Sequence, residues 1–314
     1  MTDRIKIDNC RMCPRQCSAD RSRGQGFCKS FDTLRVARAA LHFYEEPFLS
    51  GEDGSGAVFF TGCSLQCIYC QNKEISRMDN FDTKPGYDVS PERLSEIFFE
   101  LKEKGALNIN LVTGTHYTNQ IAKALSKAKN EGLDIPVIWN CSGYENVDSI
   151  KELEGLVDIY LPDFKTLDPE IANKYFKAPD YPEKAKLALE EYFRQTGPFV
   201  MDTSEEALKQ SEDGLMKKGV CVRHLVTPGN IADSKNVIDF LYDTYKDDIW
   251  VSVMSQYTPM EKYPYEELNR KVSEKEYEEV VEYVMYRDIT NCMIQEGDVA
   301  DESFIPAFNG EGVI

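Results

Sequence analysis

This 314-residue chain lacks any apolar run of the roughly 18 residues that a transmembrane helix needs. Its first ten residues, MTDRIKIDNC, contain no apolar core of a secretory signal, so we expect neither export nor a membrane anchor. Positive charge is also scarce, because 36 Lys and Arg stand against 54 Asp and Glu, a net charge of −18. Since unspecific nucleic-acid binding depends on Lys and Arg, we expect no nucleic-acid partner. A chain this acidic is also not expected to adhere to anionic membranes, so we expect no membrane partner. These absences predict a cytoplasmic protein.

Cysteine, by contrast, is plentiful and unevenly placed. Seven of the ten cysteines fall in two tight clusters, which in a protein without an export signal favour metal binding over disulfides. Free cysteine is among the most buried residue types, so we interpret the remaining three as packing residues. They are Cys141, Cys221 and Cys292.

Charge divides the chain into two parts. Residues 1–38 carry a net charge of +5, so the remainder carries −23. The glycine-rich segment GEDGSG, residues 51–56, permits a turn where the two parts join. We therefore predict a Cys-rich segment over residues 1–50 that binds a second metal or cluster, and a catalytic domain over residues 51–314.

Short apolar runs alternate with helical patterns through the second part. Strands are predicted at 57–61, 108–113, 136–141, 157–161, 220–226 and 250–255. Helices are predicted at 91–104, 118–130, 147–153, 182–195, 232–245 and 274–286. This alternation favours an α/β fold with a parallel sheet, a partial (β/α)6 TIM-like barrel, whose ligands bind at the C-terminal ends of the strands.

One cysteine cluster directly follows the first predicted strand, in TGCSLQCIYCQN. Cys63, Cys67 and Cys70 have the spacing C-x3-C-x2-C. Three thiolates on a four-iron cluster leave one iron without a protein ligand, whereas a full set is four. That open iron is suited to chelation by a small molecule, which indicates catalysis. A zinc site completed by Cys141 or a histidine is the alternative interpretation.

The spacing, with an aromatic residue before the last cysteine, resembles the signature of the radical S-adenosylmethionine (SAM) superfamily. The wider pattern is similar to the pyruvate formate-lyase activating enzyme-like branch. The matching stretches are CRMCPRQCSADRSRGQGFC, HFYEEPFLSGEDGSG, FFTGCSLQCIYCQN, VRHLVTPG, MSQYTP and LNRKVSEKEY.

The resemblance implies a [4Fe-4S] cluster on Cys63, Cys67 and Cys70 that reductively cleaves SAM. The resulting 5′-deoxyadenosyl radical abstracts hydrogen from a substrate, and the protein positions the cofactor and excludes competing reactions. The implied substrate is a glycine of a partner glycyl radical enzyme; a peptide or a small molecule is the alternative. An electron donor such as flavodoxin or ferredoxin is expected. Because oxygen destroys such clusters, we expect the protein to work anaerobically.

The resemblance also implies SAM-binding residues. Tyr69 corresponds to the aromatic position near the SAM adenine. Superfamily members commonly carry Gly-Gly-Glu after the second strand, where this chain departs with Thr113, Gly114 and Thr115. Hydroxyl and carbonyl groups there offer the same kind of hydrogen bond to the SAM amino group. His116, which follows, is either a substrate-site acid or base or a residue facing water.

Three later strand ends supply further candidates. Asn140 and Ser142 are expected at the SAM ribose, although Asn and Ser also favour ordinary turns. Asp163 and Lys165 resemble the Asp-x-Lys element of glycyl radical activating enzymes. Alternation places both on one side of the chain, where they are suited to meet the methionyl end of SAM.

The last two predicted strands are less decisive. Arg223 and His224 lie on opposite faces of one strand, and the sequence does not decide which points inward; His224 is included among the cofactor-binding candidates. Gln256 and Tyr257 end the next strand and either line the substrate side or pack at the edge of the core.

The other cysteine cluster has the spacing C-x2-C-x3-C-x10-C and comprises Cys10, Cys13, Cys17 and Cys28. Four ligands enclose either zinc or an Fe-S cluster, and the sequence does not decide between them. Arginines at 11, 15, 21 and 23 are expected to offset the thiolate charge. Many activating enzymes carry extra clusters after the three-cysteine loop, whereas this set precedes it.

Two rival functions follow from the same cysteines. In one, both sets hold zinc and the chain is a structural or binding protein. In the other, two clusters carry electrons without SAM chemistry, which leaves a large α/β domain unexplained. Brown colour distinguishes a cluster from zinc, and release of 5′-deoxyadenosine distinguishes SAM chemistry from electron transfer.

Overall fold

The computed structural model describes residues 7–77, 85–295 and 306–314. Its strands are β1 (Arg35–His42), β2 (Ser55–Phe60), β3 (Tyr87–Asp88), β4 (Ile109–Val112), β5 (Val137–Cys141), β6 (Ile159–Pro162), β7 (Val200–Asp202), β8 (Leu215–Leu225), β9 (Trp250–Met254) and β10 (Cys292–Ile294). Its α-helices are α1 (Pro47–Ser50), α2 (Lys73–Ser76), α3 (Pro91–Glu103), α4 (Thr118–Asn130), α5 (Val147–Lys151), α6 (Pro169–Phe176), α7 (Tyr181–Thr196), α8 (Glu205–Gln210), α9 (Ile231–Tyr245) and α10 (Glu274–Tyr286).

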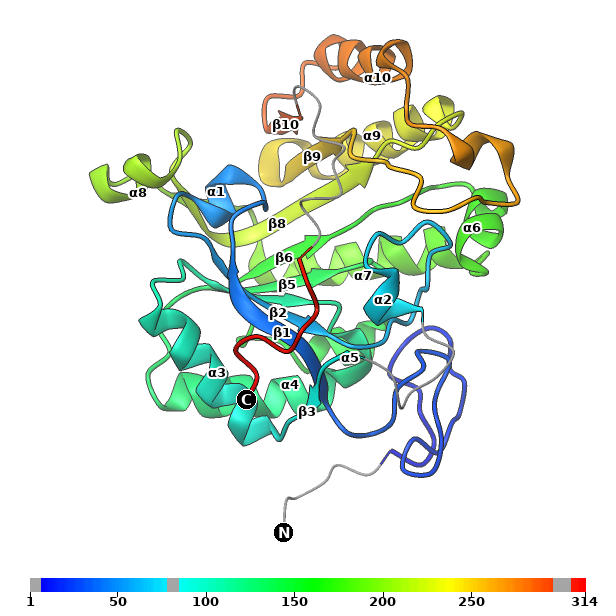
Figure 1. The fold of residues 1–314 in the computed structure, drawn as a ribbon. Helices are drawn as coiled ribbons and strands as arrows, with labels where there is room; N and C mark the ends of the chain where they lie inside the picture. The colour runs from blue at the N-terminus through cyan, green and yellow to red at the C-terminus, as the bar shows by residue number, and fades with distance from the viewer. Residues whose placement is uncertain (1–6, 78–84, 296–305) are drawn as a thin grey trace.

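One sheet organises the molecule, in the order β10-β9-β8-β6-β5-β4-β2-β1-β3, with β7 paired to β8 (Figure 1). Neighbours from β2 through β10 are parallel. The six predicted strands correspond to β2, β4, β5, β6, β8 and β9, so the predicted α/β fold with a parallel sheet is confirmed. Helices between parallel strands are expected because such a strand pair needs a long crossover connection.

The sheet extends further than the sequence pattern indicated. β1 pairs antiparallel with β2, from Val36 opposite Phe60 to His42 opposite Ser55. The predicted boundary after residue 50 therefore falls between two strands of one sheet. β1 was missed because Val36, Ala37, Ala39 and Ala40 are all buried, so the strand lacks an alternation of polar and apolar residues. Residues 7–34, which precede it, contain no helix or strand.

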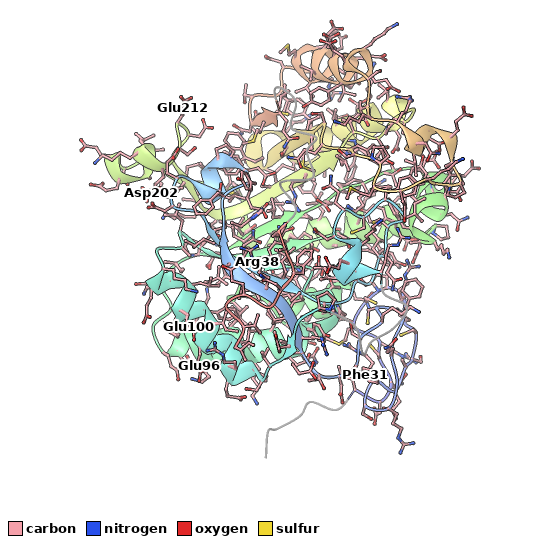
Figure 2. The ribbon with its side chains drawn as sticks, in the orientation of Figure 1. Phe31, Arg38, Glu96, Glu100, Asp202 and Glu212 are labelled. Carbon is pink, nitrogen blue, oxygen red and sulfur yellow. The ribbon has the colours of Figure 1, made fainter. Side chains whose placement is uncertain are left out.

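Amphipathic helices cover the sheet. Ser90 caps α3 by accepting a hydrogen bond from the Arg93 N–H, and Pro91 begins the helix. Phe98 on the same helix is fully buried, whereas Glu96 and Glu100 lie on its outer side (Figure 2). Across the described ranges, no helix is long and apolar enough to cross a bilayer.

The predicted site residues gather where the parallel strands end. The three-cysteine loop follows β2, and other candidates follow β4, β5 and β6. Parallel strands bring their C-terminal ends to one edge, where the loops of this architecture form ligand sites. The fold thus collects residues that are up to about a hundred positions apart in the chain.

Candidate functional site

The three-cysteine loop is ordered by its own backbone. Cys63 Sγ accepts hydrogen bonds from the N–H groups of Leu65 and Gln66, at 3.4 and 3.5 Å. Cys63 and Cys67 are buried, and negative charge on Cys70 or Cys63 raises the pKa of Cys67. The three thiols therefore lie close enough together, beside β2, for their charges to interact.

The chemistry of these thiols suits an iron–sulfur cluster, whose protein ligands are normally Cys thiolates. Within the described part of the chain, no three His, Cys, Asp or Glu side chains are close enough to share one metal ion. Three soft sulfur donors around one space fit such a cluster, and N–H groups aimed at sulfur stabilise it.

Burial keeps the unligated thiols neutral. It raises the pKa of the Cys63 thiol to about 11. Burial also raises the pKa of Cys67, although the nearby Lys165 ammonium opposes this effect. Since iron binds the thiolate, metal binding must release these protons, and the Lys165 charge favours that step.

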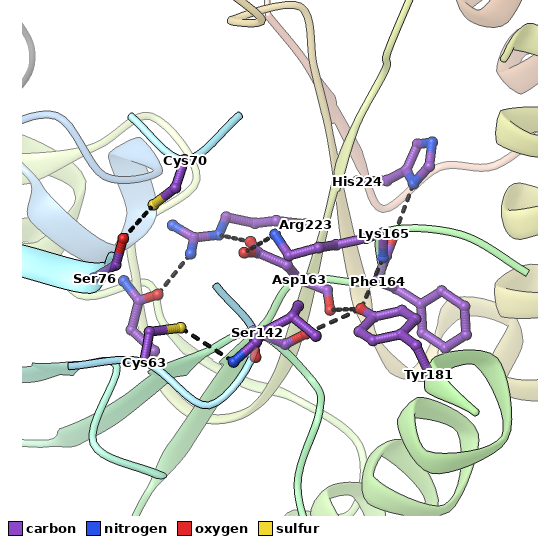
Figure 3. A network of polar contacts seen from close by, with 12 residues as sticks. Cys63, Cys70, Ser76, Ser142, Asp163, Phe164, Lys165, Tyr181, Arg223 and His224 are labelled. Atoms are coloured by element: carbon purple, nitrogen blue, oxygen red, sulfur yellow. Dashed lines mark hydrogen bonds and ion pairs between the residues drawn. The ribbon is translucent and has the colours of Figure 1, made fainter. Parts of the chain in front are cut away.

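A cavity of about 230 Å³ opens beside the loop and is lined by Cys67, Cys70, Asp163, Lys165 and Arg223 among others. Asp163 Oδ2 accepts a hydrogen bond from Lys165 Nζ at 2.7 Å, and its Oδ1 accepts one from Arg223 Nε at 3.1 Å. Figure 3 shows the carboxylate between the two cations. The predicted Asp163 and Lys165 thus meet at the cysteine loop, as the alternation indicated.

The charges of this group stabilise one another. Burial alone would raise the pKa of Asp163, but Lys165 and Arg223 lower it below its usual value. Burial alone would lower the pKa of Lys165, but Asp163 raises it well above the usual value. All three groups are therefore ionised near neutral pH, which provides both a buried anion and buried cations for a zwitterionic ligand.

Glu45, in the loop between β1 and α1, was not predicted. Its Oε2 accepts from Arg223 at 3.0 Å, and its Oε1 accepts from Asn140 at 3.2 Å and from Asn110 at 3.0 Å. It thereby fixes the end of β5 to Arg223. The stretch HFYEEPFLSG, already noted for its resemblance, contained this residue, but no single-chain pattern assigned it a role.

Arg223, and not His224, faces the cavity. His224 is only 1% exposed; its Nδ1 lies 2.8 Å from the Phe164 carbonyl oxygen and its Nε2 lies 2.9 Å from Ser234 Oγ. Successive strand residues point to opposite faces, so the two cannot both reach the site. The assignment of His224 as a cofactor-binding residue is therefore corrected (Figure 3).

The segment after β4 is set by backbone contacts. Thr113 adopts a left-handed conformation with φ of +63°, and its N–H donates to the Asn140 carbonyl at 2.8 Å. Gly114 approaches the Trp139 ring so closely that a Cβ would lie 2.8 Å from it. Thr115 is buried, and His116 Nε2 lies 2.9 Å from the Thr61 carbonyl oxygen. His116 is therefore not a water-facing residue, because it is 1% exposed.

A second carboxylate that sequence reasoning missed, Glu145, anchors this segment. It accepts hydrogen bonds from Thr115 Oγ1 at 2.6 Å, from Trp139 Nε1 at 2.9 Å and from the Tyr192 hydroxyl. Ser142, three residues earlier, offers its carbonyl to the Tyr181 hydroxyl at 3.0 Å. Glu145 thus holds the ends of β4 and β5 against α7.

Aromatic side chains form one wall of the cavity. Tyr69 packs edge-on against Tyr257 and Tyr175, with ring centroids 5.7 and 5.8 Å apart. Tyr69, Gln256 and Tyr257 all line the cavity. Gln256 also accepts a hydrogen bond from Gln71 Nε2 through its carbonyl, at 3.1 Å. An apolar wall with a few polar groups is typical of small-molecule sites.

The N-terminal cysteines also lie near one another. Cys13 is buried, and negative charge on Cys28, Cys10 or Cys17 raises its pKa. Of the arginines expected here, Arg21 is fully buried, and its Nη1 lies 4.0 Å from Cys10 Sγ. The other three are committed elsewhere or point outward: Arg23, for example, forms an exposed pair with Asp20.

This segment packs directly on the three-cysteine loop. Arg15 donates to the Ser64, Leu65 and Phe176 carbonyls, at 3.0, 3.2 and 2.7 Å. The Cys63 N–H donates to the Cys28 carbonyl at 3.3 Å. Gly62 permits this approach, because a Cβ there would lie 2.8 Å from the same carbonyl oxygen, and its φ is +100°. The two cysteine sets are therefore immediate neighbours.

None of the three remaining cysteines lines the cavity beside the three-cysteine loop. Cys141 and Cys221 are buried, as expected of packing residues, and Cys292 is half-buried. Cys141 Sγ lies 3.3 Å from the Tyr192 hydroxyl, which places it in the Glu145 network and not among metal ligands. Zinc completed by Cys141 therefore receives no support from its position.

Comparison with known proteins places this geometry in context. The model of the radical SAM superfamily matches residues 57–240. An uncharacterized protein of Methanocaldococcus jannaschii is 29% identical over 280 residues, covering 87% of this chain and 73% of the relative. SuiB of Streptococcus suis bound to S-adenosylmethionine has a TM-score of 0.48 at 15% identity, covering 83% of this chain and 51% of SuiB. Methylornithine synthase (PylB) has a TM-score of 0.44 at 15% identity, covering 84% of this chain and 76% of the synthase. The chain thus spans about half the length of SuiB.

Proposed function

The chain belongs to the radical SAM superfamily, and from that premise we propose that it cleaves SAM at a cluster held by Cys63, Cys67 and Cys70 and abstracts hydrogen from a substrate. Members of this superfamily use a [4Fe-4S] cluster and SAM. The observation that carries the proposal is that Cys67 and Cys70, of the loop that also holds Cys63, line one cavity together with the Asp163–Lys165 pair. When bound, the cluster supplies the single electron that breaks the SAM sulfonium bond.

The chain's own residues bind and orient SAM. Lys165 presents an ammonium to the SAM carboxylate, and Asp163 presents a carboxylate to its amino group or sulfonium. Asn140 is held in place by Glu45 and Arg223, ready to bind the ribose. Tyr69, with 7% of its surface exposed, packs beside the adenine and excludes water from the reacting end.

Thr113, Gly114, Thr115 and Ser142 contribute mainly backbone groups in this proposal. The Thr115 hydroxyl already donates to Glu145. The Gly114 carbonyl accepts the Tyr117 N–H, and the Thr115 carbonyl accepts the Thr118 hydroxyl. The Thr113 carbonyl is therefore the acceptor that we propose for the SAM amino group. This replaces the Glu of the common Gly-Gly-Glu motif. The Glu145 anchor keeps those carbonyls in position.

We further propose that the sheet is an open, partial (β/α)6 barrel and that the protein belongs to the pyruvate formate-lyase activating enzyme-like branch. The substrate in that branch is a glycine of a partner enzyme; a small molecule or a peptide is the alternative. Support comes from the stretches around the cysteine loop and the Asp-x-Lys element. Purified protein that cleaves SAM but leaves no glycyl radical on any co-encoded candidate enzyme would remove the activating-enzyme assignment.

The remaining proposals concern the N-terminal cysteines, the cellular setting and the electron donor. We propose that Cys10, Cys13, Cys17 and Cys28 hold a second metal centre, zinc or an Fe-S cluster, supported by their spacing in the sequence and by the buried Arg21 beside Cys10. We propose a cytoplasmic, anaerobic setting with a flavodoxin or ferredoxin as electron donor. A reduced open-site cluster requires both an electron source and protection from oxygen.

The test is SAM cleavage by protein reconstituted anaerobically with iron and sulfide. We expect a brown protein that absorbs near about 400 nm and releases 5′-deoxyadenosine after addition of dithionite. Replacing Cys63, Cys67 and Cys70 by Ala abolishes the release. Replacing Cys141 by Ala serves as the matched control and leaves it intact. Colourless protein that contains only zinc contradicts the proposal.

A further inference from the structure

A second, larger cavity lies behind Arg223. Its volume is about 750 Å³, within the usual range of ligand pockets of about 300–1,000 Å³. It is enclosed by the loop between β1 and α1, the loop after α8, and strands β8 to β10. Arg223, Met254 and Gln256 line both cavities. A molecule in the larger cavity is therefore separated from the SAM site by a few side chains only.

The lining of this cavity is strongly acidic. Among the described residues, its carboxylates are Glu45, Glu46, Glu52, Glu212 and Asp213. The one lining cation in the same part of the chain is Arg223, which already pairs with Glu45 and with Asp163. Figure 2 shows Glu212 on the loop after α8. A cavity whose charged groups are mostly negative concentrates cations.

Glu46 is the buried carboxylate among these five. Its side chain is only 6% exposed, and it lines the cavity. Its Oε2 has no hydrogen-bond partner among the residues that the structure describes. Burial raises the pKa of Glu46, whereas the nearby Arg223 charge and a hydrogen bond with Ser252 lower it. The unpartnered oxygen is unfavourable in a buried carboxylate, and a ligand cation is a partner that removes the penalty. Glu45, beside it in sequence, has three partners and needs none.

We propose that this cavity is the substrate site and that it binds an organic cation, an ammonium or guanidinium group, through Glu46. The inference rests on the proposed radical function. Of the substrates proposed above, it favours a small molecule or peptide that carries a cation over a glycine of a partner enzyme. The rest of the substrate extends past Arg223 toward the SAM cavity, where hydrogen abstraction takes place. Glu212 and Asp213 at the rim draw the cation in.

The experiment is calorimetry on the full-length, reconstituted protein with two uncharged-backbone probes. N-acetyl-lysinamide and N-acetyl-norleucinamide differ only in the terminal ammonium group. We expect the lysine probe to bind about tenfold more tightly or better, the usual effect of a hydrogen bond to a charged partner. Equal affinity for the two probes overturns the proposal.

Variants locate the effect. Glu46→Gln, which keeps the shape of the side chain, reduces the preference for the lysine probe to about threefold or less. Glu212→Gln combined with Asp213→Asn lies on exposed positions, does not endanger folding, and weakens binding of the lysine probe at low salt. Glu278→Gln on the exposed face of α10 is the matched control and changes neither. A preference that survives in both acidic-site variants overturns the assignment to this cavity.

The two levels of the proposal fail separately. SAM cleavage by the same wild-type protein is measured without probe. If SAM is cleaved but the probes are not distinguished, the substrate class is wrong and the radical function stands. If the lysine probe is preferred but SAM is not cleaved, the cavity binds cations, but the radical function is wrong and the role of the cavity as its substrate site is wrong with it.

Discussion

Arg223 Nε donates to Asp163 Oδ1 at 3.1 Å, and the Arg223 carbonyl accepts the Phe164 N–H at 2.8 Å. The two residues thus join β8 to the end of β6 through side chain and backbone together. Because Lys165 holds the other oxygen of Asp163, this carboxylate has a fixed orientation before SAM arrives. Preorganised groups of this kind lose little entropy on binding.

Asp163 is the first residue to test. We expect Asp163→Asn to weaken SAM binding by about tenfold, because a charged hydrogen bond to the amino group, or an ionic attraction to the sulfonium, becomes a contact with a neutral side chain. Iron content stays at the wild-type level, since the three cysteines are unchanged. Equilibrium dialysis with SAM against reconstituted protein measures the effect.

Asp158, at the opposite end of the same strand, offers the matched control. It forms an ion pair with Lys129 at 3.2 Å and does not line the cavity. Asp158→Asn therefore leaves SAM affinity unchanged. Equal SAM affinity in Asp163→Asn and wild-type protein, at equal iron content, contradicts the role given to Asp163.

Arg15 is predicted to hold the three-cysteine loop in shape. Arg15→Lys removes hydrogen bonds to the Ser64, Leu65 and Phe176 carbonyls, because a single ammonium cannot reproduce the fork of a guanidinium. We expect a loss of about 1–3 kcal/mol of unfolding free energy and slower incorporation of iron into the loop. Urea unfolding and iron uptake followed by absorbance measure the two effects.

Arg23→Lys is the comparison for that variant. Arg23 lies in the same segment, but 84% of its side chain is exposed. Its single ion pair with Asp20 contributes about 0–1 kcal/mol at most. A similar loss in both variants would mean that the Arg15 contacts do not hold the loop.

Glu145 is expected to support the site from beneath. In Glu145→Gln one oxygen becomes an amide that faces donors from Trp139 and Tyr192, so a buried N–H group lacks an acceptor. We expect a loss of about 1–3 kcal/mol of unfolding free energy. Urea unfolding measures it, with the exposed Glu190→Gln on α7 as control.

A double-mutant cycle with Tyr192→Phe identifies the cause. Removing the Tyr192 hydroxyl relieves part of the conflict, so the double variant loses less than the sum of the single losses. Additive losses in the cycle are the result that this explanation does not allow.

The parallel core of the fold was predictable because each of its strands contains a short apolar run. In β8 this run is only the second half of an 11-residue strand, so the prediction at 220–226 missed its start at Leu215. The predicted helix 118–130 coincides with α4, Thr118–Asn130. Elements outside that alternation were missed. β10 is a three-residue strand, Cys292–Ile294, and gains its identity only from pairing with β9. α6 was missed although Asp168 caps it and Pro169 begins it, because the helix is only 8 residues long.

The candidate site was predictable where chemistry determines residue type. Three closely spaced cysteines and the Asp163–Lys165 pair have few other uses at a strand end. Glu45 and Glu145 were not predictable, because a glutamate in a loop is usually solvated and only the fold brings donors to it. The choice between Arg223 and His224 likewise depends on which strand face is concave, which a single strand does not reveal.

The acid stability of the C-terminal helix gives a final prediction. Glu276 completes a capping box at the start of α10, in which its Oε2 accepts the Ser273 N–H at 3.0 Å. It also accepts from Arg270 at 2.6 and 2.7 Å and from the Gly229 N–H at 2.9 Å. Arg270 above all, with the Ser273 and Gly229 N–H groups, holds the pKa of Glu276 far below its usual value. Because the folded pKa is depressed, the contribution to stability is complete above the unfolded pKa of about 4.3 and is lost as the pH falls below it.

Glu276→Gln should therefore lower the unfolding free energy by about 0.5–2 kcal/mol at pH 7, the usual loss for a helix cap. The difference from the wild type should shrink as the pH is lowered from about 4.3 toward 3, since the wild type loses the same contribution by protonation. Urea unfolding at several pH values measures the difference, and Glu278→Gln, exposed two residues further on, should show none at any pH. A difference between Glu276→Gln and wild type that is constant from pH 7 to about pH 3 would mean that the carboxylate charge does not stabilise the helix start, and that only the shape of the side chain matters.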